Sequence, residues 1–470
     1  MTGATSGMPS PQEMVDQALR QSSADGCVVV VSEHSETNLR WAANSLTTNG
    51  SMQSRSVTVI STFDRGSGTS AGVVSRSVTT QDELAAVVRE SEQSGQDATP
   101  ADDAMSLVES YEHPDDGWDV EPTATGVEVF ERFASDLSAV FANWKKNDRL
   151  LFGFAEHQLT SYFLGTSTGI RRRFDQPDGR LELNGKSADF ARSAWSGMHT
   201  EDFSDVDVAA LTDAVDTRLD WAANRIELPA GHYETILPPT AVADLMIYAY
   251  WTASARDADE GRNVYAGPQG SRIGERLATL PLTLRSDPAE PGLRCPPFEI
   301  ATQSQAGLQS VFDNGLAVTP VRWIDDGALA ALARTRSWAA KTNAESQPLV
   351  GNLILERTDG AGASLEEMIA NTERGLLLTC LWYIREVDPQ SLLLTGLTRD
   401  GVYLVENGAV VGAVNNFRFN ESPISLLGRA SEAGRTVHTL SREWSDYFSR
   451  TAMPALRIPD FNMSTVSQAS

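Results

Sequence analysis

Polar and apolar residues recur along the chain with two different periods, which predict strands in some segments and helices in others. Ser54 to Phe63 alternates polar and apolar residues, as a half-buried strand does. Cys27 to Ser32 is a short apolar run, and Thr37 to Ala42 follows it as a second strand-like piece. Thr240 to Asp257 instead repeats its apolar residues every three or four positions, which predicts an amphipathic helix.

Two helix starts carry a capping box, a pair of side chains that satisfies the first free amides of a helix. Thr80 with Glu83 predicts a helix over about 82–93, and Ser364 with Glu367 begins a helix that ends near Gly375. Ser204 is a suitable N-cap for a further helix. The remaining helices that we expect span residues 13–22, 126–147, 204–224 and 324–340.

The last hundred residues are rich in strand patterns and turn signals. Asp400-Gly401 and Asn407-Gly408 are residue pairs typical of two-residue hairpin turns. Gly66, Gly68 and Gly72 follow a strand, but AGVVSRSV comes next and predicts a strand, so a hairpin loop is favoured over a dinucleotide site. The other strands that we expect span residues 148–159, 161–170, 171–183, 376–385, 391–398, 401–405 and 409–416.

Together these elements predict an α+β protein. An N-terminal α/β part precedes a large, strand-rich, mainly antiparallel C-terminal domain, and 470 residues suffice for two or three domains. The expected boundaries are a disordered tail at 1–25, an N-terminal α+β region at 26–225 with a sub-boundary in the acidic segment 95–120, a C-terminal domain at 226–462 and a tail at 463–470.

The net charge and the cysteine content indicate which classes of partner and which cellular compartment to expect. The formal net charge of −25 repels phosphate backbones, so we expect no nucleic-acid partner. No apolar run approaches the ~18 residues of a membrane span, and residues 1–12 carry no signal-peptide pattern, so we expect a cytoplasmic protein without a membrane segment. Cys27, Cys295 and Cys380 lie far apart and predict reduced, partly buried thiols.

The chain contains no familiar catalytic motif. Its six histidines are scattered, and HExxH, HxH, CxxC and GxSxG are all absent. The densest group of polar ligands, Glu33 to Glu36, is expected to be a solvated loop, and Cys380 an inert buried thiol. The paired carboxylates follow from the acidic composition. A zinc site assembled from scattered residues remains an open alternative.

A resemblance to a known family adds a more specific hypothesis. Gly351 to Leu427 resembles the C-terminal region of TldD/PmbA ("modulator of DNA gyrase") peptidases in the order of a GN element, a SLEEMI-type helix, a VDP-type turn and a strand pair closing on VENGAVVGAV. Glu234 to Met246, Asp313 to Leu329 and Asn38 to Leu46 resemble earlier elements of the family. The likeness covers about residues 25 to 460 and is most specific in the last hundred.

Within this family, the resemblance implies a PmbA/TldE-like member without the metal site. TldD members carry HExxxH on a helix and a distant Cys, whereas PmbA/TldE members lack both and pair with a TldD subunit that cleaves unfolded or precursor peptides. The motif positions fall near Ile247, Tyr248 and Thr252, none of which can supply the imidazole ligands or the carboxylate base. No Cys follows Cys380, and residues 448–456 read FSRTAMPAL. We therefore expect no metal and no cofactor.

Residues 381–389 are the strongest candidate for peptide contact. Trp382 and Tyr383 offer stacking surfaces, Arg385 a bidentate donor, and the strand an edge for β-addition. The alternative is an ordinary strand end in which Arg385 pairs with Asp388. For the helix at 240–257, the alternatives are a partner-binding or cavity-lining helix and a plain core helix.

Three functions follow from these expectations. The leading hypothesis is a non-catalytic, regulatory or structural subunit of a TldD/TldE-like peptidase, which completes a closed chamber with a TldD-like metal-bearing subunit or with a second copy of itself. The second is a stand-alone peptidase with an unorthodox active site. The third is a non-enzymatic homodimer that binds peptides without cutting them.

Overall fold

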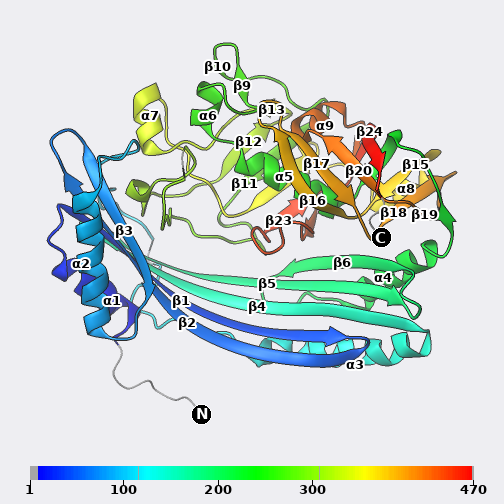
Figure 1. Ribbon diagram of the computed structural model, residues 1–470, viewed down its shortest axis with the longest axis horizontal. Coiled ribbons are helices and arrows are strands. Elements are labelled where there is room, and N and C mark those ends of the chain that lie inside the picture. The colour runs from blue at the N-terminus through cyan, green and yellow to red at the C-terminus, as the bar shows by residue number, and fades with distance from the viewer. Residues whose placement is uncertain (1–8, 115, 306, 468–470) are drawn as a thin grey trace.

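The first half of the protein is built on a long, curved antiparallel sheet. The computed structural model describes residues 9–114, 116–305 and 307–467. The sheet has the strand order β3-β2-β1-β4-β5-β6 and crosses the molecule as a bent band (Figure 1). Its strands are β1 (Gly26–Ala42), β2 (Ser45–Asp64), β3 (Thr69–Ser77), β4 (Arg149–Thr166), β5 (Arg171–Ser187) and β6 (Ser193–Thr200).

Helices cover the two ends of this sheet separately. α1 (Pro11–Gln21) and α2 (Gln81–Asp97) lie at one end, and α3 (Glu131–Lys146), preceded by the short helix η1 (Val127–Phe130), and α4 (Val208–Trp221) lie at the other (Figure 1). Side chains from each helix pair form a hydrophobic cluster of their own with the strands beneath. The sheet therefore joins two distinct cores along its length.

The apolar run at the start of β1 reflects burial on both faces of the sheet. Val29 and Val31 pack with α1 and α2, whereas Val28 and Val30 belong to a cluster on the opposite face. That second cluster includes Phe312 from the other half of the chain. Successive strand residues point to opposite faces, so a strand covered on both sides is apolar without interruption.

Two further sheets form the second half, which lies across one face of the band (Figure 1). The larger, ten-stranded sheet has the order β16-β17-β20-β24-β8-β15-β18-β19-β7, with β21 beside β24, and most of its pairs are antiparallel. Its strands are β7 (Arg225–Ile226), β8 (Gly231–Leu237), β15 (Arg374–Leu378), β16 (Leu381–Asp388), β17 (Leu393–Thr398), β18 (Val402–Glu406), β19 (Ala409–Val414), β20 (Phe417–Glu421), β21 (Glu432–Ala433) and β24 (Leu456–Val466).

The smaller sheet and the helices complete this half. The sheet order is β13-β12-β11-β14-β23-β22, and a two-stranded ribbon, β9 (Ala266–Gly267) with β10 (Gly270–Ser271), stands apart. The six strands are β11 (Leu282–Ser286), β12 (Val321–Asp325), β13 (Ala328–Leu329), β14 (Leu353–Arg357), β22 (Val437–Thr439) and β23 (Thr451–Met453). The helices are α5 (Pro239–Trp251), α6 (Ala255–Asp259), η2 (Val311–Asp313), α7 (Arg336–Thr342), α8 (Leu365–Ala370) and α9 (Pro423–Arg429).

The observed architecture confirms the predicted α+β class but corrects the expected tails. Residues 11–21 form α1, whose Met14 and Val15 are buried, so 1–25 is not a disordered tail over its described part; residues 1–8 lie outside the described residues. At the other end β24 continues to Val466, because Met463 pairs with both β8 and β20. Of the expected tail at 463–470, residues 468–470 lie outside the described residues.

The segment 95–120 begins with the end of α2. From residue 98 to 126 the described residues, 115 not among them, form no helix or strand. Leu107 and Val108 are nevertheless buried, in the cluster that contains Val28 and Phe312. The segment thus packs between the two halves of the chain.

No helix in the described ranges 9–114, 116–305 and 307–467 is long and apolar enough to cross a membrane.

Candidate functional site

α5 is the helix on which the family resemblance places the metal motif, and the structure makes it a core helix. It starts at Pro239, a residue favoured in the first helical turn, and its residues are buried on nearly every side. Ile247 has no exposed surface and packs in the large hydrophobic cluster of the second half. Thr252 ends the helix, and its hydroxyl donates to the carbonyl of Ala249 at 3.0 Å.

Aromatic side chains from the segment 443–448 cover the side of α5 that the core leaves open. The Trp444 ring lies 5.7 Å from the ring of Tyr248 and 5.2 Å from that of Trp251. Phe448 lies 6.5 Å from Trp251, and the Trp444 indole N–H donates to the carbonyl of Asp244 at 2.9 Å. The structure therefore brings the late segment onto α5 and fills the space between them with rings.

The donor chemistry at this place does not fit a hydrolytic metal ion. Ile247 has no ligand atom, the Tyr248 ring meets that of Trp444 edge to face, and the Thr252 hydroxyl is bonded within its own helix. Over the described residues of the whole chain, no three His, Cys, Asp or Glu side chains are close enough to hold a metal. We therefore derive no chemical step through a metal at α5.

A buried carboxylate links α5 to the strand predicted to contact peptides. Asp244 has no exposed surface, and one of its carboxylate oxygens accepts the backbone N–H of Glu443 at 2.8 Å. Burial raises the pKa of Asp244 well above its usual range, and the hydrogen bond from the Glu443 backbone N–H offsets only part of that shift. The Glu443 carboxylate in turn accepts the backbone N–H groups of Tyr383 and Ile384, at 3.1 and 3.0 Å.

β16 lies at the edge of the ten-stranded sheet, as the expected β-addition requires. The Tyr383 side chain is 52% exposed, and the backbone at this residue has a positive φ of 52° within a bulge. Because Glu443 already occupies the N–H groups of Tyr383 and Ile384, an added strand would have to displace that carboxylate there. The edge is partly closed by a side chain of the same molecule.

The four residues singled out for peptide contact do not form one cluster. Tyr383 and Arg385 face outward beside Glu443, and Arg385 lies 3.5 Å from its carboxylate. Trp382 is half-buried beneath the Arg442 guanidinium, 4.3 Å from its ring centre. Asp388 accepts the backbone N–H of Ser391 in the turn that follows β16, at 3.1 Å. The alternative pairing of Arg385 with Asp388 is wrong, since the ion-pair partner of Arg385 is Glu443.

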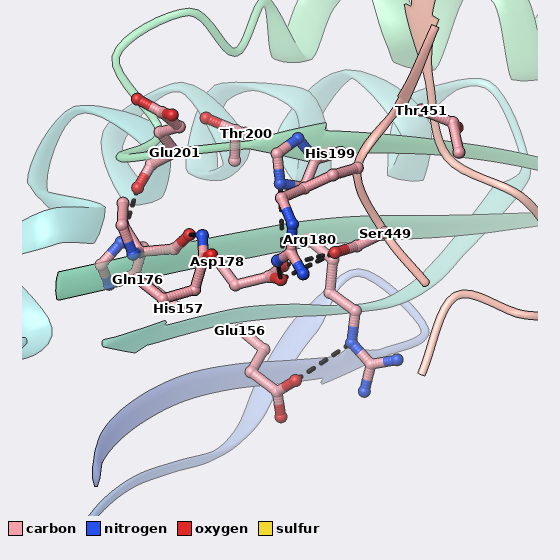
Figure 2. A network of polar contacts seen from close by, with 12 residues as sticks. Glu156, His157, Gln176, Asp178, Arg180, His199, Thr200, Glu201, Ser449 and Thr451 are labelled. Atoms are coloured by element: carbon pink, nitrogen blue, oxygen red, sulfur yellow. Dashed lines mark hydrogen bonds and ion pairs between the residues drawn. The ribbon is translucent and has the colours of Figure 1, made fainter. Parts of the chain in front are cut away.

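A second polar network joins the curved sheet to the segment that covers α5 (Figure 2). Asp178 on β5 accepts the Ser449 hydroxyl at 2.7 Å, forms an ion pair with Arg450, and lies 3.7 Å from the His199 ring. Arg180, two residues along the same face of β5, bonds to Glu156 at 3.1 Å and to Asp446. Sequence reasoning missed this network, although the spacing of Asp178 and Arg180 places both on one face of a strand.

Ser449, His199 and Asp178 do not have the arrangement of a nucleophilic triad. In a triad the imidazole stands between the hydroxyl and the carboxylate, whereas here the hydroxyl donates directly to the carboxylate. Burial lowers the pKa of His199 to about 4, so its ring is neutral at pH 7. These residues form a structural joint between the halves of the molecule.

Cys27 and Cys295 are more deeply buried than the sequence predicts, and Cys380 is buried as expected. All three are buried free thiols. Burial raises the pKa of Cys27 and of Cys295 to about 11, and that of Cys380 further still. A thiol that stays protonated is a poor nucleophile, so none of the three offers an activated thiolate.

Comparisons with known proteins agree with this fold. The profile of the PmbA/TldA metallopeptidase C-terminal domain matches residues 230–465. The structure resembles TldE from Thermococcus kodakarensis, with a TM-score of 0.77, 16% identity, and coverage of 96% of this chain and 99% of that one. No curated protein sequence matches the chain.

Two further solved structures share the fold over nearly their whole length. A protein described as a candidate modulator of a DNA gyrase, from Thermotoga maritima MSB8, has a TM-score of 0.75 and 16% identity, with coverage of 96% of this chain and 99% of that one. A second, described as a candidate modulator of DNA gyrase and from Bacteroides thetaiotaomicron VPI-5482, has a TM-score of 0.75 and 14% identity, with coverage of 97% and 98%.

Proposed function

Because the chain belongs to the PmbA/TldD metallopeptidase family, we propose that it is a non-catalytic subunit of a peptidase complex that handles unfolded or precursor peptides. One observation carries the proposal. The α5 positions at which the family resemblance places the metal motif are Ile247, Tyr248 and Thr252, and the Trp444 ring meets those of Tyr248 and Trp251 edge to face. A chain without metal ligands at that place can still shape a chamber whose chemistry a partner supplies.

The surface around β16 is the part of the chain that we assign to peptide or partner contact. Tyr383, Val387 and Tyr447 are exposed by 52, 56 and 77%, and the backbone N–H of Tyr383 donates to the Glu443 carboxylate. Large exposed apolar and aromatic side chains are enriched where proteins bind one another. The partner is a metal-bearing relative with HExxxH, or a second copy of this chain.

The test compares the chain alone with the chain co-expressed with an HExxxH-bearing relative from the same genome. Metal content and cleavage of an unfolded fluorogenic peptide are measured for each preparation. We expect neither stoichiometric zinc nor cleavage for the chain alone, and chelator-sensitive cleavage for the mixture. Chelator-sensitive cleavage by the isolated chain would instead favour a stand-alone peptidase.

A pair of variants tests whether the exposed side chains of β16 contact the peptide. The double variant Tyr383→Ala/Arg385→Ala removes two exposed side chains of β16. We expect it to raise the KM of the mixed complex for the peptide about tenfold and to leave kcat unchanged, since loss of binding that is equal in the ground and transition states changes KM alone. Arg322→Ala, at an exposed surface pair with Asp325, serves as the control. Equal effects of the two changes would remove β16 from the proposal.

A further inference from the structure

A cavity of about 630 Å³ lies where the far end of the curved sheet meets the ten-stranded sheet. Its walls come from β5 and the turn before β6, from β7, from the start of β16, and from the ends of β18 and β19. This volume is in the range of small-molecule and peptide-end sites. Both halves of the chain contribute to it, so the fold itself creates the space.

The lining of this cavity has a charge opposite to that of the protein as a whole. The chain carries a formal charge of −25, yet the lining includes five cationic residues and two acidic ones. The cationic residues are Lys186, Arg192, Arg225, Arg399 and Arg442. A cavity with a cationic lining and walls of low dielectric concentrates anions.

Three of these cations have no carboxylate partner within ion-pair distance among the described residues: Lys186, Arg192 and Arg225. Arg192 donates to the carbonyl of Leu219 at 3.0 Å, and Arg225 donates to the carbonyl of Ala191. Each guanidinium therefore uses one part of its fork on a neutral carbonyl and retains further N–H donors. The other two are already paired, Arg399 with Asp400 and Arg442 with Glu182.

Hydrogen-bond donors without a partner gather in the same lining. Within the described chain, buried donor atoms that lack a protein partner include the Tyr403 hydroxyl, the Trp382 indole nitrogen and the Asn415 amide nitrogen, and all three residues line this cavity. Leaving such groups unsatisfied costs about 1–3 kcal/mol each, so water or a ligand is expected beside them. The Asn184 amide oxygen is an acceptor without a partner in the same lining, so the unpartnered donors still outnumber it, and a ligand rich in acceptor oxygens matches them.

We propose that this cavity binds the free carboxylate at the C-terminus of a peptide. A carboxylate accepts bidentate hydrogen bonds from guanidinium groups, and Arg192 and Arg225 have donors to spare. Trp382 begins the exposed part of β16 and also lines the cavity, so a peptide lying along Tyr383 and Arg385 reaches it at one end. The choice of a peptide rests on the proposed function, whereas the choice of an anion rests on the lining alone.

The test uses a short neutral peptide with a fluorescent label at its N-terminus, made once as the free acid and once as the C-terminal amide. Binding to the full chain is followed by fluorescence anisotropy. We expect the free acid to bind at least about tenfold more tightly than the amide, because amidation removes the charge that the cations recognise. In the variant Arg192→Met/Arg225→Met the two peptides should bind equally.

Arg322→Met is the matched control, since Arg322 is an exposed arginine outside the cavity, and it should keep the preference for the free acid. Lys186→Met provides a second cavity variant in case the double variant is poorly folded, and it should reduce the preference. An amide that binds the unmodified chain as tightly as the free acid would overturn the proposal. So would full recovery of affinity by an amidated peptide with an internal Asp, which would assign the cavity to side-chain carboxylates.

The peptide-handling function and the carboxylate site in the cavity fail under different results. If neither peptide binds the chain, alone or with its metal-bearing relative, then the proposed peptide-handling function fails. If both peptides bind with equal affinity, peptide handling stands and the assignment of the cavity to the terminal carboxylate is wrong.

Discussion

Individual side chains decide what α5 can do. The sequence predicts from residue type alone that Ile247, Tyr248 and Thr252 offer no metal ligands, and the absence of a metal site stays a prediction. The sequence could not predict that the Trp444 ring would meet those of Tyr248 and Trp251 edge to face, because that contact joins residues nearly two hundred positions apart. The role of Glu443 at β16 was also missed, because its contact with Tyr383 joins residues 60 positions apart.

Trp444→Ala tests how far the aromatic cover stabilises the molecule. The change removes ring contacts with Tyr248 and Trp251 and the hydrogen bond to the Asp244 carbonyl. We expect the free energy of unfolding, measured with denaturant, to fall by about 2–3 kcal/mol. Tyr447→Ala, three residues away and at a 77% exposed side chain, should change it by less than about 0.5 kcal/mol.

Asp244→Asn tests the buried carboxylate through its pH dependence. The pKa of Asp244 is raised in the folded state, so its contribution to stability is full below the unfolded pKa of about 4 and is lost as the pH rises through the folded pKa. The amide keeps the acceptor for the Glu443 N–H but does not titrate. We therefore expect the variant to gain stability relative to the unmodified chain between pH 5 and pH 8, by an amount on the order of 1 kcal/mol.

Denaturant titrations at several pH values measure this difference. Asp388→Asn is the control, because hydrogen bonds in the turn after β16 lower the pKa of that exposed carboxyl. The control should show no gain of stability with rising pH. A variant of Asp244 whose stability runs parallel to that of the unmodified chain at every pH would contradict the account.

At the scale of elements, turn residues predicted a hairpin correctly only where the two strands they join are neighbours in the sheet. Asn407-Gly408 joins β18 and β19 as a hairpin, with positive φ at both residues, as predicted. Asp400-Gly401 also has positive φ at both residues, but β17 and β18 lie apart in the sheet, so the predicted hairpin is wrong. A residue pair specifies the shape of a turn and leaves the pairing of its strands to the rest of the fold.

The expected helix over 324–340 fails for a related reason. Asp326-Gly327 forms a two-residue turn with positive φ at both positions and pairs β12 with β13, so the helix forms only over α7. The alanine-rich composition after this turn favoured a helix, and the turn signal outweighs it.

The expected loop at Glu33 to Glu36 is also wrong. These residues lie inside β1, where Glu33 pairs with Arg55.

Other element boundaries moved for local reasons. α4 begins after Asp207, whose side chain accepts the Ala210 N–H at 3.0 Å, so Ser204 is not its N-cap. Strands expected at 148–159 and 161–170 form the single strand β4, because the long sheet continues past the polar residues between them. The expected strand 376–385 is divided between β15 and β16.

Gly408→Ala tests the turn between β18 and β19. Gly408 has φ of 79°, and a Cβ there would stand 2.5 Å from the carbonyl oxygen of Ala370. We expect a loss of unfolding free energy of about 2–4 kcal/mol, from left-handed strain together with this contact. Gly360→Ala has a similar φ of 65° with open space around it, and should cost only about 1 kcal/mol. Thermal or chemical unfolding of both variants separates the contact from the strain.

At the scale of the whole molecule, the two halves are held together by ion pairs and by packing. Asp178 on the curved sheet reaches Ser449 of the other half (Figure 2). Asp178 also pairs with Arg450, and Arg180 pairs with Asp446. The α+β class and the order of the halves were predictable from the succession of patterns. This joint was not, because it depends on how one sheet curves over the other half.

Asp178→Ala tests the joint between the halves. The change leaves the partly buried Arg450 and the Ser449 hydroxyl without their acceptor, so we expect a loss of about 2 kcal/mol in unfolding free energy. Scanning calorimetry should show the melting transition broadening or dividing as the halves lose coupling. Asp325→Ala removes an exposed ion pair with Arg322 and should change the free energy of unfolding by less than about 0.5 kcal/mol.

The position of β24 has a consequence for how the chain is made. β24 pairs with β8 on one side and β20 on the other, so the last described strand lies inside the large sheet and bonds residues more than two hundred positions earlier. During synthesis the curved sheet, complete by residue 200, can form while the ribosome is still translating the remainder. The large sheet cannot be completed until β24 has been synthesised. Until then the nascent chain presents the open edges of β8 and β20, and chaperone protection matters most during this interval.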